Sequence, residues 1–363
     1  MLKTYKIQDI CMLEKGKQID TSLLDDNNPY QYINGGISAS GYYDKYNTKE
    51  NTIIVSEGGA SCGYVNFVTE KFWCGCHCYR LMEPKVKSEY LYYALKANQH
   101  GIMRLRSGCA MPNIKKSSFY NMQIKLDDNQ DNQIKVTSIL KKVTTLILKR
   151  KEQLTKIDFL VKSRFIEMFG NIRREESLSS LVKFLSRGKS PDYVEISTIK
   201  VLNQACIYWD KIKYENARFQ NIQKLNPNAI LHNNDLLINS TGTGTLGRCN
   251  IFLPSDTATY MADSHITIVR LKKDLINSVY LKAFLSFAHT QTELYRKCVN
   301  GSTNQIELSK EKLCNFKVQV PEIDKQLEYA SFIQQLDKSK FRIKKSLEKL
   351  EMTYKALLQE YFG

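Results

Sequence analysis

The stretch from residue 134 to residue 170 reads IKVTSILKKVTTLILKRKEQLTKIDFLVKSRFIEMFG and is highly regular. Residues at alternating intervals of four and three are mostly apolar, as in the seam of a coiled coil. Ten consecutive positions that keep this spacing predict one long helix that packs against another. The seam positions are Val136, Leu140, Val143, Ile147, Arg150, Leu154, Ile157, Val161, Arg164 and Met168.

A second copy of this stretch, LEYASFIQQLDKSKFRIKKSLEKLEMTYKALLQEYFG, occupies residues 327–363 and aligns with the first without a gap at a shift of 193. Two matching helices in one chain most simply pair with each other, so we expect the apolar seam residues to form the coiled-coil interface. Basic residues interrupt the seams at Arg150, Arg164 and Lys340, where long side chains are expected to reach the seam edge. The second seam consists of Tyr329, Ile333, Leu336, Lys340, Ile343, Leu347, Leu350, Tyr354, Leu357 and Tyr361.

The repeat extends upstream of the helices, although most of the sequence between the matching segments differs. We interpret the halves as two modules that do the same job on different targets. A duplication kept only for stability is the alternative. The matching pairs are 14–20 with 186–192, Ser56-x-Gly58-x4-Gly63 with Ser240-x-Gly242-x4-Gly247, 106–108 with 299–301, and 121–126 with 315–320.

The segments between the predicted helices are mixed in character. Short β-branched runs such as 52–55 and 265–269 lie between Gly, Asn and Asp turns, which predicts short strands. Helical patterns appear at 88–98 and 275–287, the same relative place in both halves. The predicted fold class is α+β, with two globular domains separated by two long helices. The predicted domains are 1–130 (first globular domain), 131–170 (first long helix), 171–321 (second globular domain) and 322–363 (second long helix).

The charge of the chain points to a polyanionic partner. Fifty-three Lys and Arg residues against 37 Asp and Glu residues leave a formal net charge of +16. Such an excess favours nucleic acid, because each phosphate that is neutralised releases condensed counterions. A membrane surface is the competing polyanion, but no apolar run approaches ~18 residues and the N-terminus lacks a signal-peptide core. We therefore expect a cytoplasmic protein without a membrane partner.

Loop residues near the glycine landmarks have side chains suited to binding DNA. Arg, Lys, Asn and Gln pair with base edges, and Ser, Thr and glycine-loop amides suit phosphate oxygens. Any one of them is more often a surface residue without a function, so the prediction depends on their clustering. The candidates are Asn34, Ser40, Tyr42, Lys45, Tyr46, Ser56, Ser61, Arg104, Arg106, Asn113, Arg187, Lys189, Ser240, Thr241, Thr243, Thr245, Arg248, Lys297, Asn300, Ser302, Thr303 and Asn304.

Catalytic and cofactor motifs are missing or incomplete in the sequence. The run 242–247 satisfies G-x-G-x-x-G, but a strand-like run follows it where a dinucleotide site needs a helix. Residue 183 is Lys where a phosphate-binding loop ending at 188–190 would need Gly. The tripeptide 28–30 (Asn-Pro-Tyr) is one proline short of the motif of an adenine methyltransferase. We expect no catalytic, cofactor-binding or metal-binding residues in this chain.

Ten cysteines are scattered through the chain, and a disulfide framework is not expected in a basic cytoplasmic protein. The one cluster is Cys74-Gly-Cys76-His-Cys78. On a strand these three thiols would share one face and could hold a soft metal. A second pair of ligands is not visible, so packed strand cysteines are the preferred interpretation.

Taken together, these residues resemble the DNA-specificity subunit of type I restriction–modification systems over essentially the whole chain. The resemblance rests on the two domains, the Ser-x-Gly-x4-Gly turns, the strands at Asn121 and Asn315, and the helices ending in Phe-Gly. The run Val320-Pro321-x4-Gln326-x3-Ala330 resembles the family's entry to its second helix, and 34–41 (NGGISASG) resembles one common class of recognition domain. The first copy departs at Asp127-Asp128, where proline is usual.

The resemblance implies a role in recognition without chemistry. Each globular domain would be a target-recognition domain that reads one half of a split, asymmetric site on double-stranded DNA. The helices would pair antiparallel, fix the gap between the half-sites and dock two methyltransferase subunits. Separate restriction subunits, which are also the motor, would complete the complex. S-adenosylmethionine, ATP and Mg are then expected on those partner subunits and not on this chain.

Three other functions stay open at this point. The chain could serve a related stand-alone modification system as its specificity element. It could be a catalytic DNA methyltransferase or nuclease with an unrecognised site. It could also be a structural coiled-coil protein that binds RNA.

Overall fold

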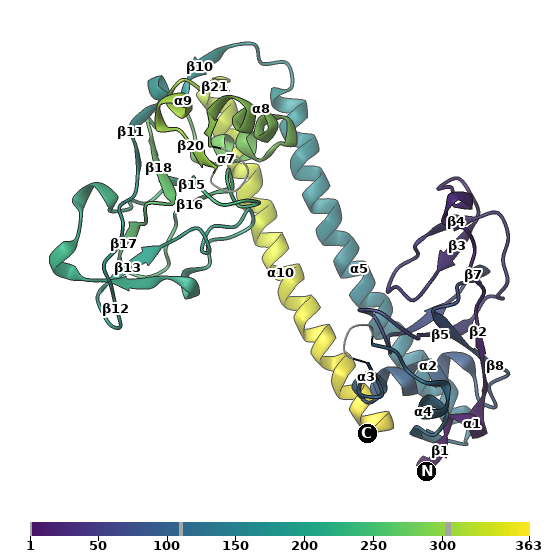
Figure 1. Ribbon diagram of the computed structural model, residues 1–363. Helices are drawn as coiled ribbons and strands as arrows, with labels where there is room; N and C mark the ends of the chain where they lie inside the picture. The colour runs from purple at the N-terminus through teal and green to yellow at the C-terminus, as the bar shows by residue number, and fades with distance from the viewer. Residues whose placement is uncertain (1, 109–111, 302–305) are drawn as a thin grey trace. The chain divides into compact units, whose positions relative to one another are not determined.

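The computed structural model describes residues 2–108, 112–301 and 306–363 and divides into two compact units (Figure 1). The first unit comprises Met1–Gln153 and Arg342–Gly363, and the second comprises Leu154–Phe341. Each unit holds one globular domain and a portion of both long helices, because α5 (Gln130–Phe169) and α10 (Ile323–Phe362) each cross the division. Mixed helices and short strands give the α+β class that the sequence predicts.

In the first unit, the globular domain contains a four-stranded antiparallel sheet of order β2-β8-β5-β6. A smaller sheet has the order β4-β3-β7, and its β3–β7 pair is parallel. A separate antiparallel pair joins β1 to β9. The strands are β1 (Leu2–Lys6), β2 (Met12–Lys15), β3 (Tyr30–Ile33), β4 (Gly41–Tyr43), β5 (Thr52–Ser56), β6 (Val65–Val68), β7 (Phe72–Cys74), β8 (Cys78–Met82) and β9 (Gln123–Asp127).

The core of the first unit lies between the larger sheet, α2 (Ser88–Ala97) and the long helices. Tyr90 and Leu91 of α2 are buried there together with Leu140 of α5 and Phe362 of α10. The predicted helical pattern at 88–98 is therefore confirmed as α2, whose apolar residues recur on the face that meets the sheet. The shorter helices are α1 (Ile7–Ile10), η1 (Thr21–Leu23), α3 (Gln99–Arg104) and α4 (Lys116–Tyr120).

In the second unit, the corresponding sheets have the orders β11-β18-β15-β16 and β12-β14-β13-β17. Two further antiparallel pairs are β10-β21 and β19-β20. The strands are β10 (Glu175–Ser177), β11 (Val182–Arg187), β12 (Tyr193–Val194), β13 (Ile199–Leu202), β14 (Arg218–Gln220), β15 (Leu236–Asn239), β16 (Cys249–Ile251), β17 (Thr259–Ala262), β18 (Ile266–Leu271), β19 (Val299–Asn300), β20 (Glu307–Leu308) and β21 (Lys317–Gln319).

The helices of the second unit cover one side of its larger sheet. Tyr280 and Leu281 of α7 (Ser278–Ser286) and Leu294 of α8 (Ala288–Cys298) are buried in a core that also takes Phe165 of α5 and Tyr329 of α10. The remaining helices are α6 (Leu178–Leu181), η2 (Tyr214–Asn216), η3 (Ile222–Lys224), η4 (Pro227–Ala229) and α9 (Lys310–Cys314).

Both globular domains repeat one topology, down to a glycine that follows the first strand of the larger sheet. The amides of Gly16 and Gly188 donate to the carbonyls of Cys78 and Ile266 at 3.2 and 2.9 Å. A Cβ atom at either glycine would lie 2.2 Å from a backbone oxygen, so no other residue fits without a backbone shift. This close approach explains why the sequence pattern Gly-Lys recurs at 16–17 and 188–189.

The repeated glycine turn corrects one predicted correspondence. Ser56 exchanges backbone hydrogen bonds with Gly63 and Tyr64, whereas the residue that does so with Gly247 and Arg248 is Asn239. The predicted match of Ser56 with Ser240 is therefore wrong by one residue. The second turn has one more residue before its last glycine, which a comparison of spacings alone cannot reveal.

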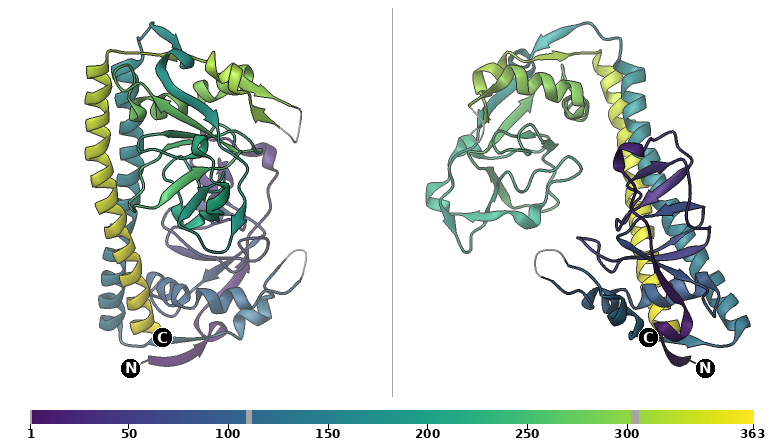
Figure 2. Two further views of the ribbon diagram at one scale, coloured as in Figure 1. Left: turned by 90° about the vertical axis from the view of Figure 1, so that its left-hand side faces the viewer. Right: turned by 45° about the vertical axis from the view of Figure 1, so that its right-hand side comes forward.

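The long helices pair antiparallel within each unit (Figure 2). In the first unit Lys151 of α5 forms an ion pair with Glu351 of α10 at 3.3 Å, and in the second Arg164 pairs with Glu328 at 2.8 Å. None of the twenty predicted seam positions is exposed, as expected for residues between two paired helices. The basic interruption at Lys340 also has an acidic partner, Asp158.

Candidate nucleic-acid interface

In the first domain, a glycine turn connects β5 to the edge strand β6. Gly59 and Gly63 have φ angles of +75° and +80°, a backbone conformation that glycine adopts without a steric penalty. The Gly63 amide donates to the Ser56 carbonyl at 2.7 Å and closes the turn. Its carbonyl accepts a hydrogen bond from the Gln99 Nε2 at 2.6 Å, so α3 braces the turn from outside.

The equivalent turn of the second domain is built in the same way. Gly242, Gly244 and Gly247 have φ angles of +94°, +78° and +82°. The Gly247 carbonyl accepts from Gln291 of α8 at 3.4 Å, as Gly63 does from Gln99. The tip of this turn, Thr243 and Gly244, is exposed. Both domains thus hold a tight turn of exposed backbone on a rigid support.

Each glycine turn lies beside a hairpin that carries further predicted residues. Gly58 and Ser107 both bridge to Asn113, and Thr241 and Asn300 both bridge to Glu307. The structure therefore brings together clusters that the sequence placed in separate segments. The predicted residues Ser302, Thr303 and Asn304 lie outside the described residues.

Polar side chains behind the turns are buried. Ser56 and Ser240 have almost no exposed surface, and the Ser240 hydroxyl is hydrogen-bonded to Thr267. These two predicted residues therefore have almost no surface that DNA could contact. In the first domain, the nearly buried Glu57 carboxylate accepts a hydrogen bond from Tyr79 at 2.9 Å. Burial and this hydrogen bond raise the pKa of Tyr79.

Several of the predicted cationic and polar residues already have partners within the domain. Arg187 forms an ion pair with Glu307 at 3.0 Å and donates to the Leu308 carbonyl at 2.8 Å. Arg106 donates to the Cys62 carbonyl at 2.8 Å. These contacts give both arginines a structural role: Arg187 joins β11 to β20, and Arg106 joins its own segment to the glycine turn.

Lys297 and Asn34 also make internal contacts. Lys297 and its neighbour Arg296 both bind Glu293, and these hydrogen bonds lower the pKa of Glu293 to about 2. Asn34 donates to Gln18 and accepts from the His77 amide, so it joins two loops of the first domain.

Other predicted residues remain accessible for a ligand. They are exposed, and among the described residues their side chains have no hydrogen-bond or ion-pair partner. A guanidinium, ammonium or amide without an internal partner breaks no internal hydrogen bond when it binds a phosphate or a base edge. These residues are therefore the stronger candidates for DNA contacts. They are Ser40, Tyr42, Lys45, Arg104, Asn113, Lys189 and Thr243.

Three cations stack on aromatic rings in the second domain, and of these only Arg248 was predicted from the sequence. Arg248 and Lys213 lie 5.6 and 4.2 Å from the ring centroid of Tyr208, and Arg218 lies 3.6 Å from that of Tyr193. Stacking fixes the orientation of an arginine while leaving its edge free to bind. The aromatic pair Tyr208-Trp209 inside a polar loop was the available signal.

Contrary to the prediction from the sequence, the three cysteines of the cluster do not lie on one strand. β7 ends at Cys74 and β8 begins at Cys78, so Cys76 lies in the turn between them and the three thiols do not share a strand face. Cys74 and Cys78 are fully buried. Within the described residues, no group of three His, Cys, Asp or Glu side chains is placed to hold a metal ion. Likewise, no helix of the described chain is long and apolar enough to cross a membrane.

These features define the class: a tandem-repeat α+β protein in which each repeat carries a braced glycine turn and a long helix. Over residues 2–157 and 183–352 the sequence matches the family described as the type I restriction modification DNA specificity domain. The chain belongs to this family.

Relatives and solved structures agree with this membership. A protein of Mycoplasma genitalium named as a type I specificity subunit is 36% identical over 137 residues, which is 37% of this chain and 36% of the relative. One from Mycoplasma pneumoniae is 38% identical over 117 residues, which is 31% of each chain. These matches span about a third of the length of the relatives.

The fold similarity extends over the whole chain. The crystal structure of the S subunit of a type I restriction–modification system from M. genitalium has a TM-score of 0.68 and 20% identity, with 100% of this chain and 96% of that chain covered. A structure described in work on complex assembly and conformational transition of the type I system has a TM-score of 0.57 and 14% identity, with coverages of 99% and 97%.

Proposed function

We propose that this chain is the specificity subunit of a type I restriction–modification complex and reads a split, asymmetric site on double-stranded DNA. Each globular domain reads one half-site through the loops beside its glycine turn. The long helices set the spacing of the half-sites and dock two methyltransferase subunits, and restriction subunits complete the complex. The family membership together with the duplicated glycine turn carries the proposal.

Differences between equivalent loops favour half-sites of different sequence. The loop between β3 and β4 has seven residues (34–40), whereas its counterpart between β13 and β14 has fifteen (203–217). Side chains at equivalent strand positions differ as well: Gln31 corresponds to Lys200 and Tyr42 to Phe219. Two copies with one backbone and different loops suit two different base sequences, because base edges are read by side chains.

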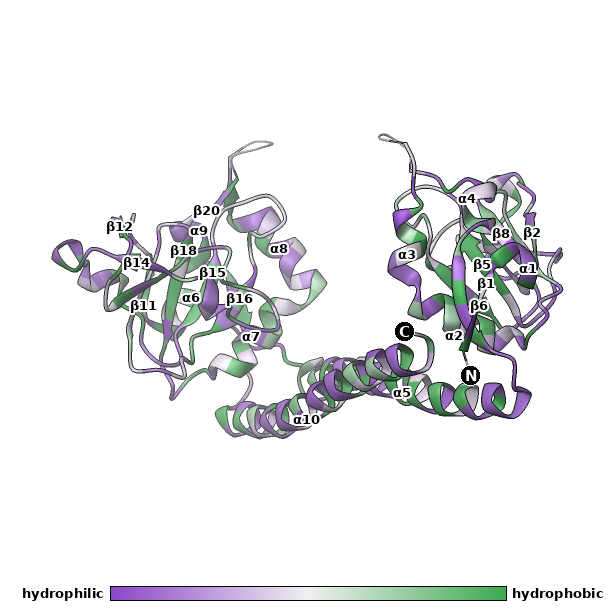
Figure 3. Ribbon diagram, turned by 90° about the horizontal axis from the view of Figure 1, so that it is seen from below, coloured by the Kyte–Doolittle hydropathy of each residue, from purple (hydrophilic) through white to green (hydrophobic). Residues whose placement is uncertain are grey.

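Apolar residues on the long helices favour the docking of two like partners. Ile134 and Leu327, at equivalent positions, are 48% and 50% exposed, and Phe159 and Met352 are 72% and 63% exposed. The members of each pair belong to different units, so each unit presents its own copy of the surface. Figure 3 shows apolar and polar residues following one another along both helices. Large exposed apolar side chains at repeated positions are typical of a surface that a partner covers.

In this proposal the chemistry belongs to the partners. The methyltransferase subunits bind S-adenosylmethionine and modify adenine, and the restriction subunits use ATP and Mg. The accessible cations of this chain, such as Lys45, Arg104 and Lys189, provide the non-specific attraction to DNA that its net charge of +16 favours.

The test is to map methylated adenines in a host without other methylation, with the methyltransferase expressed with and without this chain. We expect a two-part asymmetric motif that appears only when the chain is present. Asn113→Ala should alter one half of the motif, and Thr243→Ala should alter the other. Methylation or cleavage of DNA by the purified chain alone would overturn the proposal, and so would a methylation pattern that does not depend on the chain.

A further inference from the structure

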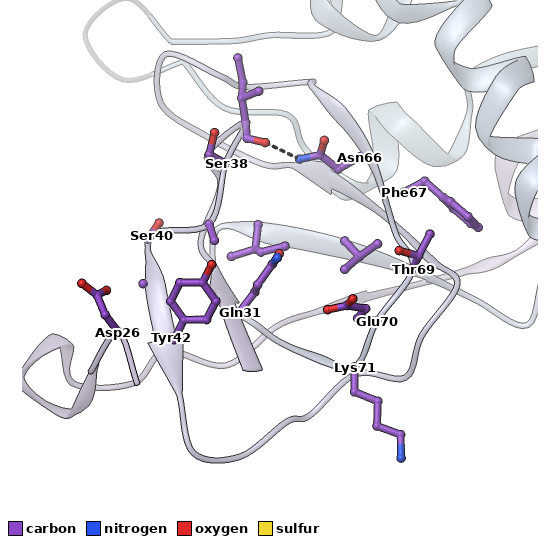
Figure 4. A pocket seen from close by; sticks show the side chains of 15 residues that line it. Asp26, Gln31, Ser38, Ser40, Tyr42, Asn66, Phe67, Thr69, Glu70 and Lys71 are labelled. Atoms are coloured by element: carbon purple, nitrogen blue, oxygen red, sulfur yellow. Dashed lines mark hydrogen bonds between the residues drawn. The ribbon is translucent and has the colours of Figure 1, made fainter. Parts of the chain in front are cut away.

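The first globular domain contains an open hollow of about 750 Å³ (Figure 4). It lies between the loop that joins β3 to β4 and the segment that leaves β6, with Ile33 and Val68 among its apolar lining residues. Hollows of this size commonly accept small organic molecules. The proposed spacing and docking roles do not use it.

In the second domain, a larger side chain occupies one position that is equivalent to a lining residue of the hollow. Asn66 and Asn250 occupy equivalent positions on β6 and β16. Asn66 donates to the Ile37 carbonyl of the β3–β4 loop at 3.2 Å, and Asn250 donates to the Tyr208 carbonyl of the β13–β14 loop at 2.8 Å. Two residues after these asparagines, Val68 in the first domain corresponds to Phe252 in the second.

Aromatic side chains pack around Phe252 in the second domain. The Phe252 ring lies 5.3 Å from the ring of Tyr260 and 6.3 Å from that of Tyr214, measured between centroids. Tyr214 comes from the fifteen-residue loop that replaces the seven-residue loop of the first domain. The hollow therefore results from a shortened loop and a smaller side chain at residue 68, on a scaffold that is otherwise retained.

Polar groups face this hollow without internal partners. Gln31 and Tyr42 lie directly opposite each other on β3 and β4 and both line it (Figure 4). In the described residues, neither side chain has a hydrogen-bond partner. The counterpart of Gln31 is Lys200, and in the second domain its ammonium is bound by Asp256 at 2.7 Å and Tyr260 at 3.4 Å. Gln31 thus presents an amide that nothing in its own domain satisfies.

The charged lining residues favour hydrogen-bond donors over phosphate. Asp26 and Glu70 supply exposed carboxylates. Lys71, the one cation in the lining, lies 4.9 Å from the ring centroid of Tyr46. A phosphate group would meet two carboxylates here, whereas an exocyclic amino group would find acceptors.

From this geometry we propose that the hollow binds an unstacked nucleobase with an exocyclic amino group, adenine in preference. The Gln31 amide offers the donor and acceptor that pair with the N6 and N7 edge of adenine. The Tyr42 ring offers a stacking surface of the kind that holds bases outside a duplex. The inference deepens the proposed function, on which it rests, by assigning the first domain a second way of contacting DNA.

Saturation-transfer NMR on the full chain tests the site directly, with adenosine, guanosine, cytidine and thymidine as separate probes. We expect adenosine to bind with a Kd of about 1 mM or below and thymidine, which lacks the amino group, not to bind. Gln31→Ala should weaken adenosine binding at least about tenfold. Val68→Phe, which introduces the residue found at the equivalent position of the second domain, should abolish it.

Ile196→Ala, a change at a strongly exposed position of the other unit, is the control and should bind adenosine like the unaltered chain. Circular dichroism measures whether each variant is folded. If Val68→Phe does not fold, Gln31→Ala still tests the site. Absence of adenosine binding at about 10 mM, or equal binding by Gln31→Ala, would overturn the inference. Mapping of methylated adenines distinguishes failure of this inference from failure of the proposed function. If the chain directs a two-part motif but does not bind adenosine, the inference about the hollow is wrong and the proposed function stands.

Discussion

Leu148 on α5 and Phe341 on α10 occupy equivalent positions 193 residues apart, and their exposed fractions are 67% and 68%. Neither residue belongs to a seam, so the pairing of the long helices does not need them. If each is part of a docking surface, Leu148→Asp and Phe341→Asp should each weaken the binding of one methyltransferase copy by about 2 kcal/mol, roughly thirtyfold. Light scattering of the assembled complex should then show one bound copy in place of two.

The double variant should bind neither copy, and both single variants should keep the melting temperature of the parent because the changed side chains are exposed. Ile196→Asp, in the second globular domain, is the control and should still bind two copies. Retention of two copies by either single variant would contradict the docking role of that position.

Removing one heptad from each long helix tests the spacer role. Deletion of 149–155 and 342–348 keeps the four-three spacing and takes equivalent residues from both helices. Seven residues at ~1.5 Å each span about 10 Å, and one base pair rises about 3.4 Å. We expect adenine mapping to show the same two half-sites with a gap about three base pairs shorter. Changed half-site letters with an unchanged gap would refute the spacer role.

The long helices could be predicted from the sequence because their signal is local and repeated. The predicted spans 131–170 and 322–363 differ by one residue at each end from α5 and α10. The strand order could not be predicted in this way. β3 pairs parallel with β7, about forty residues away, and nothing in either short run specifies its partner.

Only part of the candidate interface could be predicted, because some of its features are local in the sequence and others depend on distant residues. Glycines in a turn are visible in the sequence because few other residues tolerate a positive φ, and Gly63 and Gly247 were found from their spacing. The partner of a polar side chain is not visible. Ser240 and Arg187 have the residue types of DNA contacts, but the fold supplies each with an internal partner from a distant strand or loop.

For two buried tyrosines of the second unit, loss of the hydroxyl group should change the free energy of unfolding in opposite directions. Both rings lie 5.5 Å from that of Phe165, between centroids. The Tyr280 hydroxyl donates to the Gln319 carbonyl at 2.8 Å, whereas that of Tyr329 has no hydrogen-bond partner among the described residues. A buried hydroxyl without a partner costs stability, and a satisfied one adds to it.

Tyr329→Phe should therefore raise the free energy of unfolding by about 1 kcal/mol, and Tyr280→Phe should lower it by about 1 kcal/mol. Urea denaturation of both variants measures the two changes under one condition. Because each change removes one oxygen from the same aromatic cluster, the pair controls for altered packing. A shift of the same sign in both variants would contradict the assignment of an unsatisfied hydroxyl to Tyr329.

Lys96 of α2 gives the chain a pH dependence in the alkaline range. Burial lowers the pKa of Lys96 from its ordinary value of 10.5 to about 8. Its ammonium lies 3.9 Å from the Tyr64 ring centroid and 3.2 Å from the Gln99 Oε1, contacts that offset part of this desolvation. Between pH 8 and pH 10.5 the unfolded chain binds more protons at this residue than the folded chain does. The contribution of Lys96 to stability therefore rises with pH across this window.

Lys96→Met removes the charge and keeps a flexible side chain beside the Tyr64 ring. At pH 7 the variant should be more stable than the parent, and urea denaturation at intervals up to pH 10 should show the difference shrinking, since the parent gains stability above pH 8. Lys45→Met is the matched control for replacing a lysine by methionine, because Lys45 is exposed and its side chain has no partner among the described residues. A difference for Lys96→Met that stays constant from pH 7 to pH 10 would show that the folded state does not depress the ionisation of Lys96.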